Sequence, residues 1–134
     1  MKKLVKFLLS LIAILAIGYY VLINLPKAKT KSKEAKITIE ANDLFAAYAK
    51  NEKFANNKFN GKIIEVSGIV RKVFKDKKDD TVIILQTEDA IGGILCTLEQ
   101  DPDSLPNEGR KVRIKGQCSG LLMDVVLNKC IILE

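Results

Sequence analysis

The sequence predicts a mainly β protein: a five-stranded Greek-key barrel preceded by a packing helix, with a separate N-terminal transmembrane helix. Three observations support this fold class. An uncharged apolar run fills residues 7–25, apolar residues recur at helical spacing over 40–60, and β-rich segments separated by turn residues fill 62–133. The chain has 134 residues, which suits one domain behind a short anchor.

The apolar run 7–25 predicts a membrane anchor. As a helix it is about 28 Å long, close to the ~30 Å hydrocarbon core of a bilayer. Two tyrosines stand near its end, and Pro26 can terminate the helix. A cleaved signal peptide is the alternative, but the run is long for an h-region and no A-x-A cleavage pattern follows. We expect an uncleaved anchor over residues 1–25, contacting the membrane through residues 4–25.

Charge divides the chain at the end of a lysine-rich linker, which we assign to residues 26–39. Residues 1–36 carry eight lysines and one glutamate, whereas residues 37–134 carry fourteen basic and fifteen acidic groups. Lysines stand on both sides of the apolar run, so the positive-inside rule is nearly balanced and slightly favours a cytoplasmic domain. The short basic start before a long apolar run is typical of export signals, and we expect the domain on the exported side.

The remaining residues, 40–134, form the predicted barrel domain. Its helix, over 40–60, has capping residues at its start, and its apolar positions are expected to pack on the core. Gly68 in the first strand suggests a bulge or a sharp bend. The break between the third and fourth strands matches a barrel of OB type. The predicted strands are 62–74, 81–87, 92–98, 110–118 and a last one within 121–133.

Basic residues on the fourth strand form a candidate anionic-ligand patch. Lys111, Arg113 and Lys115 alternate with apolar residues, so they share one face. An ordinary solvated strand face is the alternative. The patch would contain Arg71, Arg110, Lys111, Arg113 and Lys115, with Lys72 nearby, because the first and fourth strands are neighbours in this barrel.

Two observations disfavour nucleic acid as the ligand. The domain has no overall basic excess, although phosphate contacts supply most non-specific affinity for nucleic acids. OB folds that hold single strands also use aromatic stacking platforms, and Phe74 is the only aromatic residue after position 61.

Three segments together resemble the tRNA-anti-like family of OB-fold proteins. They are N-x-x-F-A-x-x-x-F-x-G-K-I-I-E-V-S-G-I-V (51–70), K-V-R-I-K-G-Q-C-S-G (111–120) and V-V-L-N-K-C (125–130). The resemblance covers about residues 40–133. It implies a small bacterial protein behind a signal or lipid anchor, with nucleic-acid binding ascribed by fold analogy. This chain has no cysteine just after its apolar run, so lipidation is not carried over.

Cys118 and Cys130 match the family's two C-terminal cysteines. In an exported domain they could form a disulfide, and the alternative is two buried thiols. Cys96 alternates with apolar neighbours and is expected in the core. The spacing of the three cysteines and the lack of histidine disfavour a metal site.

We therefore expect a non-enzymatic binding module of the bacterial cell envelope, anchored in the membrane and without metal or cofactor. The absence of histidine removes the usual catalytic triads, and the acidic pairs stand in apparent loops. The expected partner is a protein or another envelope component. The alternative is a single-stranded nucleic-acid binder that uses the basic strand 110–115.

Overall fold

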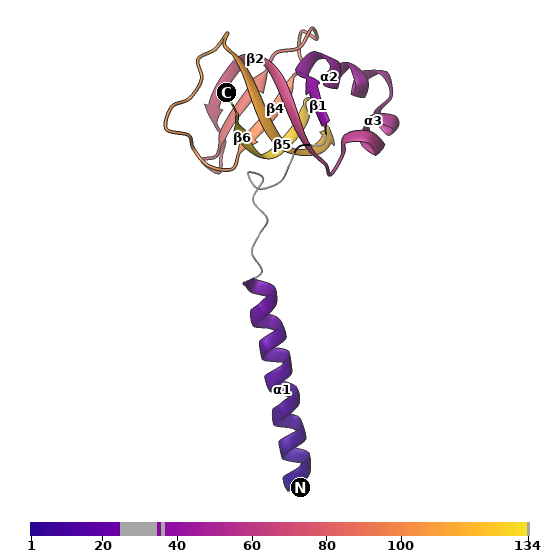
Figure 1. Ribbon diagram of the computed structural model, residues 1–134, viewed down its shortest axis with the longest axis vertical. Coiled ribbons are helices and arrows are strands. Elements are labelled where there is room, and N and C mark those ends of the chain that lie inside the picture. The colour runs from indigo at the N-terminus through magenta and orange to yellow at the C-terminus, as the bar shows by residue number, and fades with distance from the viewer. Residues whose placement is uncertain (25–34, 36, 134) are drawn as a thin grey trace.

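The computed structural model describes residues 1–24, 35 and 37–133. An isolated N-terminal helix precedes a mixed domain in which two short helices pack against a β-barrel (Figure 1). In chain order the elements are α1 (Lys2–Ile23), β1 (Ile37–Glu40), α2 (Ala41–Lys50), α3 (Glu52–Phe59), β2 (Ile63–Lys75), β3 (Thr81–Leu85), β4 (Ile94–Leu98), β5 (Lys111–Leu121) and β6 (Val125–Ile132).

Five strands close the barrel. Their order is β2-β3-β4-β6-β5, and a further antiparallel pairing between β2 and β5 joins the two ends. All the pairings around the barrel are antiparallel except β4–β6, which is parallel because residues 99–110 carry the chain across one end. This closed barrel is the OB topology that the sequence predicts. The expected neighbourhood of the first and fourth barrel strands is confirmed by the β2–β5 register.

A sixth strand, β1, lies outside the closed barrel. It pairs in parallel with the first half of β2, with Ile37 opposite Ile64 and Glu40 opposite Ser67. The sequence analysis did not predict this strand, and residues 37–39 fall in the range assigned to the linker. Most of that range, together with Leu25, lies outside the described residues.

The predicted helix over 40–60 is two helices, broken at Asn51. The Asn51 side chain accepts a hydrogen bond from the Phe54 backbone N–H at 3.1 Å, so it caps the start of α3. Tyr48 of α2 and Phe59 of α3 are buried, as a packing helix requires. Phe54 was expected on the same apolar face, but 61% of it is exposed.

Gly68 does not form the expected bulge, since it remains in register with Val112 of β5. The irregularity in β2 lies between Val70 and Lys72 instead. Gly68 lies beside the first residue of α2: a Cβ atom at this position would lie 2.8 Å from the Ala41 Cβ. The close approach of this side chain accounts for a glycine at this position.

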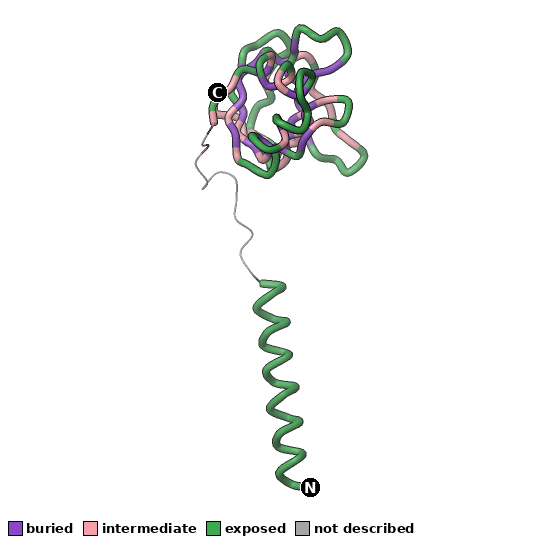
Figure 2. Tube along the Cα trace, turned by 90° about the vertical axis from the view of Figure 1, so that its right-hand side faces the viewer, coloured by how far each residue is buried: buried purple, intermediate pink, exposed green. Residues whose placement is uncertain are grey.

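Helix α1 has no buried residue, whereas the barrel encloses a continuous buried core (Figure 2). The helix is long and apolar enough to cross a membrane. A signal sequence near an N-terminus would meet the same criteria. The uncleaved anchor thus stays a prediction.

Candidate functional site

Strand β5 presents three cations on its outer face. Lys111 and Arg113 are exposed and Lys115 is half-buried, while Val112 and Ile114 between them point into the core. We call Lys111, Arg113 and Lys115 the β5 stripe. The side chains lie beside the outer face of β2, as the alternating sequence predicts.

Two cations of the β5 stripe are paired with carboxylates. Lys111 Nζ lies 3.6 Å from Glu40 Oε1 of β1, and Arg113 Nη1 lies 3.0 Å from Glu65 Oε1 of β2. Ion pairs at a protein surface contribute about 0–1 kcal/mol, and the cation of each pair is exposed, so the pairs can be broken. An anionic ligand would nevertheless have to displace Glu40 and Glu65 or accept their repulsion. The stripe is therefore less positive than its sequence suggests.

The other two residues of the predicted patch have different surroundings. Arg71 stands at the irregularity in β2, where its guanidinium donates long hydrogen bonds to the backbone carbonyls of Ile91 (3.3 Å) and Gly92 (3.4 Å). Arg110 borders a surface pocket of about 460 Å³, together with Val112, Ile132 and the loop that contains Leu105. The three cations of the β5 stripe thus lie together on one face. Arg71 instead contacts the loop that contains Ile91 and Gly92, and Arg110 borders the pocket.

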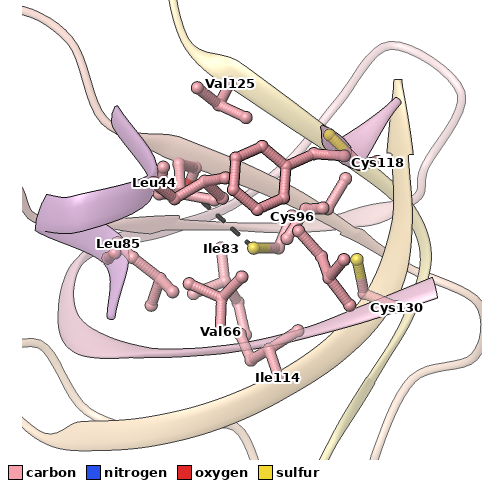
Figure 3. Close-up of a cluster of buried hydrophobic side chains, with 14 of the residues drawn as sticks. Leu44, Val66, Ile83, Leu85, Cys96, Ile114, Cys118, Val125 and Cys130 are labelled. Atoms are coloured by element: carbon pink, nitrogen blue, oxygen red, sulfur yellow. Dashed lines mark hydrogen bonds between the residues drawn. The ribbon is translucent and has the colours of Figure 1, made fainter. Parts of the chain in front are cut away.

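The expected disulfide between Cys118 and Cys130 is absent: all three cysteines are free and buried (Figure 3). The β5–β6 register places Leu127, not Cys130, opposite Cys118. The Cys118 Sγ lies 3.4 Å from the Tyr48 hydroxyl oxygen, whereas the Cys130 Sγ occupies the space left by the missing side chain of Gly116. The alternative of buried thiols therefore describes this structure.

Burial also lowers the reactivity of the Cys130 thiol. It raises the pKa of Cys130 well above its usual value, and the neighbouring Cys96 thiol raises it further. The expected place of Cys96 in the core is confirmed.

An apolar surface on the outside of the barrel was not predicted from the sequence. Phe74, Ile84, Leu95 and Val126 are half-buried and Val82 is 2% exposed, yet none of the five belongs to the core cluster. The strand registers place Phe74 beside Val82, and Ile84 beside Leu95 and then Val126. We call these five residues the outer apolar face; it extends across β2, β3, β4 and β6.

A signal for this face exists in the sequence. In the segment TVIILQT (81–87) apolar residues occupy both alternating sets of positions, so the strand must be apolar on both sides. Lys72 covers one edge of the face, with its Nζ 5.2 Å from the centre of the Phe74 ring. The one aromatic residue of the barrel strands is therefore already stacked with a cation.

The described residues contain no group of three or more histidine, cysteine, aspartate or glutamate side chains that could hold a metal ion. Two loop carboxylates bind the chain itself. Asp89 accepts backbone hydrogen bonds from Gly92 (2.6 Å) and Ile91 (2.9 Å), and these lower its pKa. Asp101 pairs with Lys75 at 2.6 Å and also accepts a hydrogen bond from the Thr81 hydroxyl.

The closed barrel order, with its parallel β4–β6 pair, defines an OB-fold protein whose outer surface offers one cationic and one apolar region. The model of the tRNA_anti-like family matches residues 1–132, and the chain belongs to this family.

A solved structure with a similar fold is the "putative nucleic acid-binding lipoprotein" from Klebsiella pneumoniae subsp. pneumoniae MGH 78578. The similarity has a TM-score of 0.58 at 13% sequence identity, and it covers 72% of this chain and 91% of that one. At this identity the likeness shows the fold alone. No curated protein matches the chain.

Proposed function

We propose that this chain is a non-enzymatic OB-fold binding module of the bacterial cell envelope, anchored in the membrane by α1. It binds a protein or another envelope component through an apolar contact. The outer apolar face is the observation that carries the proposal. Half-buried phenylalanine, isoleucine, leucine and valine side chains there extend over four adjacent strands without belonging to the core. Covering such a face with a partner removes apolar area from water.

The polar groups of the domain support a binding role over a catalytic one. The chain has no histidine, and the Asp89 and Asp101 carboxylates are engaged by backbone amides and by Lys75. A catalytic carboxylate needs a free oxygen directed toward a substrate site. Both oxygens of Asp101 are engaged, and Asp89 binds the backbone of its own loop.

Photo-cross-linking from the outer apolar face tests the proposal. A photoreactive residue replaces Ile84 in the full chain, expressed in membranes, and the same residue at exposed Lys77 is the control. We expect one discrete cross-linked species from position 84, none from position 77, and loss of the species when Leu95→Lys is added. No discrete species from position 84, or a species that Leu95→Lys leaves unchanged, would contradict the proposal.

Single-stranded nucleic acid is the second candidate ligand. It is favoured by the three cations of the β5 stripe and by the description of the Klebsiella lipoprotein. Anisotropy of a fluorescent oligothymidine separates the two candidates. Binding that weakens steeply with salt, and that is lost in Lys111→Gln/Lys115→Gln, supports the nucleic-acid function. No binding even at low salt removes it.

A further inference from the structure

The most exposed apolar side chains of the described barrel domain gather on two loops. Leu122 is 84% exposed, and Ile91 and Met123 are each 76% exposed. Leu122 and Met123 form the tip between β5 and β6, and Ile91 stands in the loop between β3 and β4. Scattered exposed apolar residues are common, but three of this size on adjacent loop tips form a patch.

Hydrogen bonds hold the two loops together. The Gly93 backbone N–H donates to the Asp124 carboxylate at 2.7 Å, and the Val125 N–H donates to the Gly93 carbonyl at 3.0 Å. The carboxylates of Asp89 and Asp124 both accept hydrogen bonds from backbone amides. One oxygen of each carboxylate is therefore held by the loop backbone, while the apolar tips remain exposed. We call the three apolar residues the loop-tip patch.

The loop-tip patch lies at the end of the barrel where β1 begins. Strand β1 runs parallel to β2, with Ile37 opposite Ile64, and β5 runs antiparallel to β2, with Gly116 opposite the same Ile64. Strand β5 therefore runs toward the end of the barrel at which β1 begins. The hairpin tip after β5 and the first residue of β1 consequently share one end of the barrel.

This end is also the one connected to the membrane-spanning candidate. Only thirteen residues, 24–36, separate the end of α1 from β1. Thirteen residues span at most about 47 Å, so an inserted α1 keeps this end of the barrel near the bilayer. We infer that the loop-tip patch inserts into the interface of the lipid bilayer that α1 crosses. The inference rests on the anchoring part of the proposed function.

Fluorescence quenching in vesicles tests the inference with the full chain. Met123→Cys carries an environment-sensitive fluorophore, and Leu105→Cys carries the same label as the matched control. Leu105 is an exposed leucine (45%) in the loop 99–110 at the opposite end of the barrel. The three native cysteines are buried and leave the added thiol as the reactive one. Vesicles of phosphatidylethanolamine and phosphatidylglycerol contain nitroxide-bearing lipids, and flotation reports membrane association.

We expect the chain to float with the vesicles, and the label at position 123 to lose emission to the nitroxide lipids while the label at position 105 does not. Flotation with an unquenched label at position 123, or with equal quenching at both positions, overturns the inference and leaves the anchor intact. Failure to float overturns the anchor and the inference with it.

A second measurement uses the other loop of the patch. A label at Ile91→Cys should also be quenched by the nitroxide lipids. The quenching should decrease when Leu122→Ser and Met123→Ser are added, because the polar hairpin no longer favours insertion. Quenching at position 91 that is unchanged by these substitutions would contradict a shared insertion of the two loops.

Discussion

At the scale of single residues, a packing constraint lies at Gly68, which lies beside the first residue of α2. A Cβ atom there would lie 2.8 Å from the Ala41 Cβ and 3.2 Å from the Leu85 Cβ, and neither neighbour is the end of a flexible side chain. We expect Gly68→Ala to lower the free energy of unfolding by about 1–3 kcal/mol, the usual cost of overpacking. Urea unfolding measures the change, with Lys77→Ala as an exposed control. An unchanged midpoint for Gly68→Ala would show that α2 can move aside freely.

A second residue, Asp101, makes stability depend on pH. The ion pair with Lys75 and the hydrogen bond from Thr81 lower its pKa. A carboxyl with a depressed folded pKa stabilises the fold above its unfolded pKa of about 3.9, and this contribution is lost as the pH falls through the folded value.

We therefore expect Asp101→Asn to lower the urea midpoint at neutral pH and to lessen the further loss below about pH 4. Urea midpoints between neutral and acidic pH, for the wild type and the variant, measure both effects. Asp103→Asn is the control, because Asp103 is an exposed aspartate in the same loop. Parallel pH profiles for the wild type and Asp101→Asn would disprove the role of this carboxylate.

At the scale of elements, local pattern predicted β5 better than it predicted β1. Val112 and Ile114 alternate with charged residues over a long strand, so the buried face of β5 can be predicted from the sequence. Strand β1 has four residues, and its pairing depends on a β2 segment more than twenty positions away. That pairing depends on tertiary structure, which a local sequence pattern does not specify.

The candidate site was predictable to a similar degree. Alternation placed the β5 stripe on one face, but its carboxylate partners, Glu40 and Glu65, stand on other strands. Only the register between strands shows that they neutralise two of the cations. The same limit applied to the cysteines, since the registers of β5 and β6 decide which residue faces Cys118.

The break between α2 and α3 gives a prediction for an element boundary. The Asn51 side chain accepts a hydrogen bond from the Phe54 N–H, one of the backbone donors that a helix start leaves unpaired. We expect Asn51→Ala to destabilise the domain by about 1 kcal/mol, as the loss of an N-cap does. Thermal unfolding measures the change, and Asn57→Ala, at an exposed position within α3, is the control. Equal midpoints for the two variants would mean that the cap contributes nothing.

At the scale of the whole molecule, α1 and the barrel domain distribute their apolar residues differently. Every described residue of α1 is exposed, although most are apolar, whereas the barrel domain buries its apolar residues in a closed core. Exposing an apolar helix of this length to water is unfavourable, and a bilayer removes that cost. The proposed membrane anchor would give α1 these surroundings, and the side on which the barrel stands would then decide which partners it can meet.

Export of the barrel domain is the last prediction. The lysines before and after the apolar run are nearly balanced, so the basic start typical of export signals is the basis for the proposed direction. Lys77→Cys places a reactive thiol at an exposed hairpin, against a background of three buried cysteines. We expect a membrane-impermeant maleimide to label this variant in intact bacteria, and Lys3→Cys, before the apolar core of α1, only after permeabilisation. The opposite pattern would place the barrel in the cytoplasm and exclude an envelope partner.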